Sequence, residues 1–270
     1  LTNGPWTKRL HPGWAAHSGI TAARLAKNGY IGPSTIIEGP SGFLHSYSDY
    51  SDPERVLEGL GDVFHIVRTS IKPHACCRYN QSGIDGLLRI VKDNGLTPEK
   101  VKKIRAGILS AGWNIVAHPE EQKRNPRSTV DAQFSMPFSA AVAVARQRAF
   151  IDEYRPELLT DPLIKDLMAR VECFKDPELD KHYPARWPAK VEIETVDGAA
   201  YSVKIDYPKG DPENPLDWGE IIEKFSLLAS PVYGEGVRSG IIECVQDLEN
   251  RPVAPLYELL GADPTDTRTT

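Results

Sequence analysis

The sequence predicts a mostly α-helical fold with one smaller α+β domain, and two observations support this class. Apolar residues recur at helical spacing near both ends of the 270-residue chain, over 12–28 and 218–260. Strand-like alternation is confined to the middle of the chain and is clearest over 191–205. We therefore expect helical flanks on either side of a mixed central domain.

The first part of the chain contains three predicted helices. The first carries Pro12 in its first turn and ends at Gly29, because proline favours helix starts and glycine favours helix ends. A shorter helix starts at Asp52-Pro53. The third begins at Ser82, keeps apolar residues at helical spacing and closes at Gly95.

The middle of the chain alternates between short elements. A helical turn at 97–98 leads into a predicted strand at 104–109. The polar stretch 119–127 is predicted to be a loop. Two helices are expected next, one rich in alanine and valine at 137–150 and one that starts at an Asp-Pro pair and covers 161–171.

A hairpin and a capped helix complete the pattern. The strands 191–195 and 201–205 alternate apolar and polar residues, and Asp197-Gly198 between them supplies the turn. Asp217 is followed three residues later by Glu220, which predicts a capping box at the start of the last helical segment.

Composition narrows the functional classes. Hydrophobic residues make up 40% of the chain and charged residues 26%, which suffices for a packed core. The net charge of −5 argues against a nucleic-acid-binding surface, and no apolar run is long enough to span a membrane. The cysteines show no CxxC or disulfide pattern, so we expect a reducing compartment, the cytoplasm or, in a eukaryote, the mitochondrion. They are Cys76, Cys77, Cys173 and Cys244.

The densest group of chemically active side chains is the run KPHACCRYNQ, residues 72–81. It places cations, a histidine, two thiols, a phenol and two amides just before a predicted helix. Cations beside the free N–H groups of a helix N-terminus favour carboxylate binding, because the helix dipole adds to their charge. The implied ligand is a small polyanion.

A second basic cluster, KRLHPGWAAHSG, covers residues 8–19. Together with Gly42-Phe43-Leu44, the 72–81 run and STVDAQFSMPF at 128–138, it resembles the MmgE/PrpD family. That family includes 2-methylcitrate dehydratase, cis-aconitate decarboxylase and iminodisuccinate epimerase. The landmarks follow the family's order and cover most of the chain.

The resemblance implies a helical domain whose chain leaves to build a smaller α+β lid and then returns. We place parts of the helical domain at 1–64 and 211–270 and the lid at 65–210. Family members are normally longer, and half of their helical domain precedes the KRLH motif. We therefore expect the helical domain here to be incomplete at its N-terminus and completed by an N-terminal half or subunit, in a dimer-based homo-oligomer.

The resemblance also assigns site residues. Its two active-site lysines fall at Lys8 and Lys72, which we expect to face one cleft, and we assign both as catalytic together with Cys77. Taken alone, a lysine is more often a surface charge and a buried cysteine more often packs in the core. The residues assigned to substrate binding are Arg9, His11, His74, Arg78, Tyr79 and Gln81. No metal site is expected.

Several alternatives stay open. Arg9 fits a structural ion pair equally well, and His11 fits a helix cap. Decarboxylase-like members carry a histidine where this chain has Cys77, and a tyrosine near Phe138. A phenyl ring donates no proton, so one acid of those relatives is missing if this correspondence holds.

The implied chemistry is removal of a proton next to a carboxylate, without metal or organic cofactor. It requires a base aligned with the C–H bond and cations that stabilise the charge that develops. The substrate is a small di- or tricarboxylate, and a 2-methylcitrate dehydratase-like hydro-lyase is favoured. The alternatives are a decarboxylase or an epimerase of the same family, a non-catalytic or complementing subunit, and a plain carboxylate-binding module.

Overall fold

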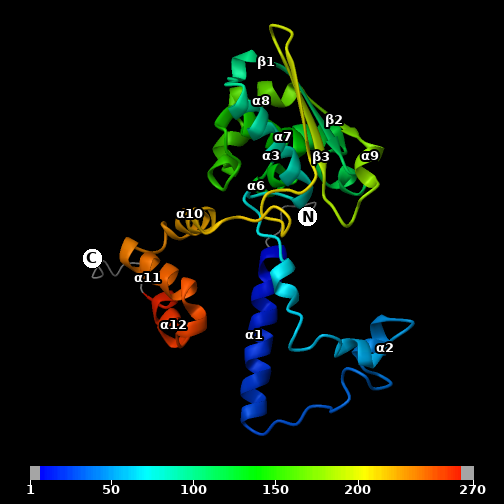
Figure 1. Ribbon diagram of the computed structural model, residues 1–270, viewed down its shortest axis with the longest axis vertical. Coiled ribbons are helices and arrows are strands. Elements are labelled where there is room, and N and C mark those ends of the chain that lie inside the picture. Colours follow the sequence, from blue (N-terminus) through cyan, green and yellow to red (C-terminus); the bar gives the residue numbers. More distant parts are fainter. Residues whose placement is uncertain (1–6, 263–270) are drawn as a thin grey trace.

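The computed structural model describes residues 7–262, except for the side chain of Arg9. Figure 1 shows an α/β unit around one sheet, from which a long N-terminal helix and a group of C-terminal helices extend. Every named strand lies within 101–205, and helices occupy both flanks. The predicted class, mostly α with a smaller α+β part, is confirmed.

The N-terminal segment is dominated by α1 (Thr7–Lys27), which begins one turn before the predicted start and so includes Lys8. The helix expected after Asp52 is only a 3-10 turn, because Gly59 and Gly61 adopt positive φ angles of 70° and 90° and reverse the chain. The other elements of this segment are α2 (Phe43–Tyr47), η1 (Pro53–Val56) and η2 (His65–Arg68).

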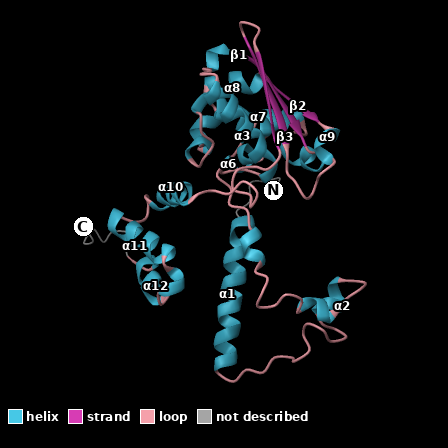
Figure 2. Cartoon of the chain, in the orientation of Figure 1, coloured by secondary structure: helices cyan, strands magenta, loops and turns pink. Residues whose placement is uncertain are grey.

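The sheet has the strand order β2-β1-β3-β4, and Figure 2 shows the strands side by side. Its strands are β1 (Val101–Ile108), β2 (Val171–Lys175), β3 (Ala189–Thr195) and β4 (Ala200–Ile205). The hairpin of β3 and β4 is confirmed, with Val191 opposite Val203. Strand β2 was not predicted: the helix expected over 161–171 stops at Ala169, and Val171 pairs in parallel with Ile104.

Helices cover one face of the sheet. They are α3 (Arg78–Asp93), α7 (Met136–Arg146) and α8 (Pro162–Ala169). Along β3 the residues Ala189, Val191 and Ile193 are buried, whereas the alternate residues on the other face form ion pairs such as Arg105–Glu192 at 2.8 Å. Helix α3 lies very close to the sheet, because a Cβ on Gly86 would come within 2.6 Å of Val191. This helix carries the end of the 72–81 run.

Short elements connect the layers. The predicted loop at 119–127 was wrong, because it contains α5, whose Arg124 guanidinium donates hydrogen bonds to the carbonyl groups of Met168 and Val171. These connecting elements are η3 (Pro98–Lys100), η4 (Ser110–Gly112), α4 (Trp113–Val116), α5 (Glu120–Arg124), α6 (Thr129–Gln133), η5 (Asp152–Tyr154), η6 (Pro156–Leu159) and α9 (Pro177–Asp180).

The C-terminal segment contains α10 (Trp218–Ala229), α11 (Glu235–Gln246), η7 (Leu248–Asn250) and α12 (Ala254–Leu260). The predicted capping box of α10 is confirmed, with the Asp217 carboxylate accepting from the Glu220 N–H at 2.8 Å.

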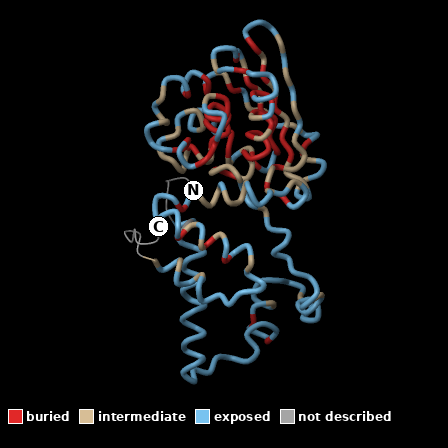
Figure 3. The backbone as a smooth tube through the Cα atoms, turned by 60° about the vertical axis from the view of Figure 1, so that its left-hand side comes forward, coloured by how far each residue is buried: buried red, intermediate tan, exposed pale blue. Residues whose placement is uncertain are grey.

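Burial differs sharply between the parts, as Figure 3 shows: buried residues gather in the α/β unit. Large apolar side chains of α1 stay open, with Leu10, Trp14 and Ile20 exposed to 59%, 64% and 58%. Among the described helices, none combines the length and apolar character needed to cross a bilayer.

Candidate functional site

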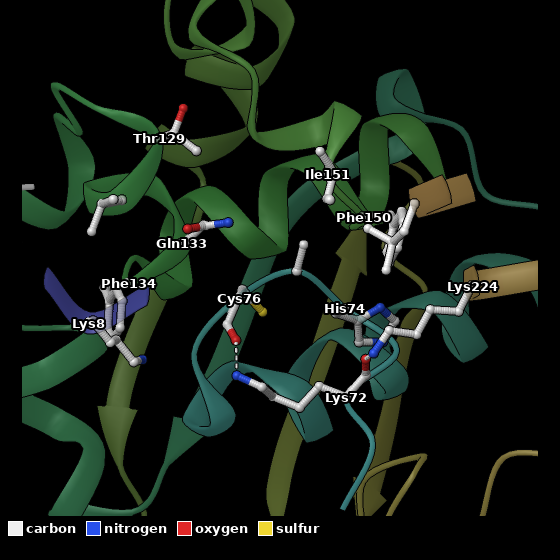
Figure 4. Close-up of a pocket in the computed structure, with 13 residues that line it drawn as sticks. Lys8, Lys72, His74, Cys76, Thr129, Gln133, Phe134, Phe150, Ile151 and Lys224 are labelled. Carbon is white, nitrogen blue, oxygen red and sulfur yellow. Dashed lines mark hydrogen bonds between the residues drawn. The ribbon is translucent and has the colours of Figure 1, made fainter. Parts of the chain in front are cut away.

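A cavity of about 540 Å³ lies where α1, the loop before α3, α6 and α10 come together (Figure 4). It is lined by Lys8, Lys72, His74, Ala75, Cys76, Thr129, Val130, Gln133, Phe134, Phe150, Ile151, Lys224 and Leu228. Two of its lysines, Lys8 and Lys72, are 64 positions apart in the sequence. The structure therefore brings the two basic motifs to one cavity, while the roles assigned to these lysines stay predictions.

The cavity wall is cationic. Lys8, Lys72 and Lys224 line it, and no aspartate or glutamate of residues 7–262 does so. The Lys8 ammonium lies 4.9 Å from the centroid of the Phe134 ring, a cation–π contact. Lys72 Nζ donates to the carbonyl oxygen of Cys76 at 3.0 Å. Among the ion pairs of the described part of the chain, none involves these three lysines, so their charge is available to an anion.

Lys224 was not identified from the sequence. Its Nζ donates to the carbonyl oxygen of Lys72 at 2.8 Å, and Leu228, one turn further along α10, lines the same cavity. Burial lowers the pKa of the Lys224 ammonium, and the nearby charge of Lys72 lowers it further. One feature of the sequence could have identified Lys224: it is a lysine within an otherwise apolar helical face, which also includes Ile221 and Phe225.

The loop from Lys72 to Cys77 is folded around the side chain of Gln81. The Gln81 amide donates to the carbonyl oxygen of His74 at 3.1 Å and to Cys76 Sγ at 3.2 Å, and its oxygen accepts from the His74 N–H at 3.3 Å. Gln81 is buried and does not line the cavity. It thus positions the loop, rather than contacting a ligand as predicted.

His74 reaches the cavity as part of a pair. Its Nε2 lies 2.8 Å from Asp85 Oδ1, and the other oxygen of Asp85 accepts from the Lys209 N–H at 2.8 Å. His74 also lines a second cavity of about 250 Å³, together with Asp85 and Lys224. An imidazole held by a carboxylate in this way resembles the orienting pair of many acid–base sites.

The two adjacent thiols have different positions. Cys76 lines the cavity, whereas Cys77 does not; Cys77 occupies the N-cap position of α3, and its N–H donates to the Gln133 carbonyl oxygen at 2.9 Å. Burial raises the pKa of Cys76 to about 12. Burial also raises the pKa of Cys77, against the opposing charges of Lys72 and Lys8. The assignment of Cys77 as a catalytic thiol stays a prediction, and of the two thiols it is Cys76 that lines the cavity.

Arg78 and Tyr79 face away from the cavity. The Arg78 guanidinium pairs with Asp211 at 2.8 Å and lies 4.7 Å from the centroid of the Trp187 ring. The Tyr79 hydroxyl lies 3.2 Å from that of Tyr183, and burial raises the pKa of Tyr79 to about 12. Neither side chain lines the cavity, and their assignment to substrate binding stays a prediction.

The remaining predicted residues lie on α1. His11 is exposed and does not line the cavity, and the side chain of Arg9 lies outside the described part of the structure. Phe138, where the resemblance implies a tyrosine, is buried in the core 5.7 Å from the Tyr154 ring. Within the described residues, His, Cys, Asp and Glu side chains form no group that could hold a metal ion.

Comparison with known families accounts for both basic motifs. The MmgE/PrpD C-terminal domain matches residues 74–250, and the MmgE/PrpD N-terminal domain matches residues 2–56. The chain belongs to the MmgE/PrpD family. The cavity lies between these two matched regions, because Lys8 comes from the N-terminal match and His74 and Lys224 from the C-terminal one.

Curated relatives in the MmgE/PrpD family are similar along most of this chain. A cis-aconitate decarboxylase from Aspergillus terreus is 26% identical over 282 residues, which cover 96% of this chain and 55% of the relative. The human cis-aconitate decarboxylase is 23% identical, covering 90% and 50%. A mitochondrial 2-methylcitrate dehydratase from Yarrowia lipolytica is 24% identical, covering 63% and 33%. The chain spans about half the length of the first relatives.

The position of Cys76 predicts slow alkylation. Because a thiol with a pKa of about 12 holds little thiolate at pH 8, iodoacetamide should label Cys76 at least about tenfold more slowly in the folded protein than in urea, where a thiol ionises near 8.5. The folded-state rate should keep rising well above pH 9. Mass spectrometry of the peptide containing Cys76 measures this, and equal rates at pH 8 in both states would contradict the burial of this thiol.

Proposed function

We propose that this chain forms the anion-binding part of a lyase that removes a proton next to a carboxylate of a small tricarboxylate, without a cofactor. The observation that carries the proposal is the cavity with three lysines, for which the described residues supply neither an acidic side chain on the wall nor an ion-pair partner. Such a cavity requires negative charge from its ligand. Membership of the MmgE/PrpD family and the names of its relatives support this ligand class.

Lys8 and Lys72 hold substrate carboxylates in this proposal. Removing a proton next to a carboxylate places a second negative charge on that group, so a cation already in position stabilises the transition state more than the ground state. The ammonium of Lys72 is steered towards the cavity by its hydrogen bond to Cys76, and that of Lys8 by the Phe134 ring. Both contacts leave N–H donors for a ligand.

The His74–Asp85 pair is our candidate for moving the proton. His74 is the histidine that lines the cavity among the described residues, and Asp85 Oδ1 holds its Nε2 at 2.8 Å. The carboxylate stabilises the imidazolium that forms when the ring accepts a proton. The thiols are weaker candidates, because burial raises the pKa of both Cys76 and Cys77 and keeps them protonated.

Two lyase reactions need such a stabilised carbanion. In a dehydratase, which is the reaction favoured from the sequence, removal of a proton forms the carbanion and the β-hydroxyl group then leaves as water. In a decarboxylase, breaking the C–C bond to CO₂ leaves the electron pair on carbon, and a proton is added there. The decarboxylase alternative gains weight because the relatives with that name match 90–96% of this chain, against 63% for the dehydratase. An epimerase would need reprotonation on the opposite face.

We also propose that the chain acts with a helical partner, an N-terminal half or subunit of the same family, in a dimer-based assembly. The exposed apolar side chains of α1, among them Leu10, Trp14 and Ile20, support this. Leaving such surface in water costs about 25 cal/mol per Å² of apolar area, so a covering protein surface is favoured. If the partner holds the remaining catalytic groups, this chain is a non-catalytic subunit that complements it.

The function is tested by turnover of cis-aconitate and 2-methylcitrate, followed by NMR, with the chain alone and with a candidate N-terminal half. We expect decarboxylation or dehydration products, and kcat/KM should fall by at least about tenfold in Lys72→Met, because a charge-assisted hydrogen bond contributes about 1.5–3 kcal/mol. Lys165→Met, on the exposed side of α8, is the control. Unchanged kinetics in Lys72→Met would contradict the proposed site.

If His74 moves the proton, its replacement should affect kcat more than KM. His74→Gln should lower kcat by about 100-fold or more with a small change in KM, as expected when a general base is removed. Asp85→Asn should lower kcat by about tenfold and leave KM nearly unchanged, because the neutral amide still orients the ring but no longer stabilises the imidazolium that forms during proton transfer. His45→Gln, exposed on α2, is the control. A loss in Asp85→Asn that appears in KM and not in kcat would leave the pair with a structural role only.

A further inference from the structure

We propose that Lys224 binds a third carboxylate of the substrate and thereby makes the cavity selective for tricarboxylates over dicarboxylates. This inference rests on the proposed function and deepens it. The carboxylate sites at Lys8 and Lys72 come from the two basic motifs, whereas Lys224 belongs to neither and reaches the same cavity from α10. It is thus a specificity residue contributed by the segment that follows the sheet.

The arrangement of the three ammonium groups supports this role. In the view of Figure 4, Lys72 lies between Lys8 and Lys224. The charge of Lys72 acts on Lys224, and the charges of Lys72 and Lys8 both act on Cys77. Three cations therefore adjoin one another around one space of about 540 Å³. A fully ionised tricarboxylate carries three negative charges and neutralises this set, whereas a dicarboxylate leaves one lysine without an anion.

The acidic side chains near Lys224 line the second cavity and are Asp85, Glu220 and Glu223. Glu220 pairs with Lys209 at 2.9 Å and Asp85 pairs with His74 at 2.8 Å, whereas Glu223 is exposed to solvent. The ion pairs of the described residues include none to Lys224. A partly buried ammonium next to another ammonium is unfavourable without an anion, so a ligand carboxylate supplies the missing countercharge.

A purely structural role is the competing explanation. Lys224 Nζ donates to the carbonyl oxygen of Lys72 at 2.8 Å, and this bond alone could attach α10 to the loop. An ammonium has three N–H donors, however, so two remain for a ligand after that bond. The attachment needs a donor but no charge. Replacement of lysine by glutamine keeps a donor and removes the charge, which separates the two explanations.

The test compares tricarballylate with glutarate, which has the same carbon chain but lacks the central carboxylate. Isothermal titration calorimetry of the 270-residue chain should show tighter binding of tricarballylate. In Lys224→Gln, tricarballylate binding should weaken by about tenfold or more, and glutarate binding by less than about twofold. Lys209→Gln makes the same charge change next to Glu220, in the second cavity only, and should leave both affinities unchanged.

Proton uptake provides a second measurement. Because the pKa of Lys224 is lowered in the free protein, a bound carboxylate should restore its proton. Binding of tricarballylate should therefore be accompanied by proton uptake at pH values just below the ordinary lysine pKa of about 10.4, as measured in buffers of different ionisation enthalpy. This uptake should be smaller in Lys224→Gln, a change that a structural tether would not produce.

The outcomes are distinguishable. If Lys224→Gln weakens the binding of both acids equally, or of neither, while Lys72→Met still weakens both, the role of Lys224 in selectivity is overturned. If the wild-type chain binds neither acid, alone or with the candidate N-terminal half, the proposed function is overturned, and the role of Lys224 with it. A selective loss of tricarballylate affinity together with reduced proton uptake supports the inference.

Discussion

The Gln81 carboxamide is the interaction on which the rest of the site depends. One buried side chain accepts from the His74 N–H and donates to groups of His74, Cys76 and Cys77. The loop before α3 belongs to no helix or strand, so these contacts set its shape together with backbone hydrogen bonds such as that from the Ala75 N–H to the Ala149 carbonyl oxygen at 3.0 Å. That shape directs Lys72 and His74 into the cavity and turns Cys77 into the cap of α3. Close packing of α3 on the sheet, through Gly86, then fixes the position of Gln81.

The remaining walls come from elements that the α/β unit does not contain. Helix α1 contributes Lys8, held over the Phe134 ring, and α10 contributes Lys224, held by the carbonyl group of Lys72. Each of these attachments is a single polar or cation–π contact, much weaker than the hydrophobic core of the α/β unit. The cavity therefore depends on how the helical segments are supported. A partner surface over the apolar side of α1 would both cover that side and hold Lys8 in place.

Much of the fold and part of the site could be predicted from the sequence. Periodicity identified α1, α3, α7 and α10, and the alternation around Asp197-Gly198 identified the β3–β4 hairpin. The 5-residue strand β2 was missed, because its parallel pairing with β1 is a tertiary interaction that leaves no periodic signal in so short a segment. Motifs correctly brought Lys8 and Lys72 to one cavity.

Contacts between distant positions explain the residues that sequence reasoning misplaced. Arg78 was assigned to a ligand, but its guanidinium binds Asp211, 133 positions away. Lys224 was missed because its environment is created by Lys72, 152 positions away. The choice between Cys76 and Cys77 depended on a start of α3 four residues earlier than the predicted Ser82. In each case the decisive factor was a tertiary contact, on which local residue type gives no information.

The most direct test of the central claim is a crystal structure of the protein with a bound tricarboxylate such as tricarballylate. We expect carboxylate oxygens of the ligand at about 2.7–3.2 Å from Nζ of Lys8 and Lys72, in the cavity bounded by Phe134 and Phe150. We also expect that the Arg78–Asp211 pair stays intact and does not contact the ligand. A ligand bound at Arg78 in place of Asp211, with the lysine cavity left without an anion, would contradict the central claim.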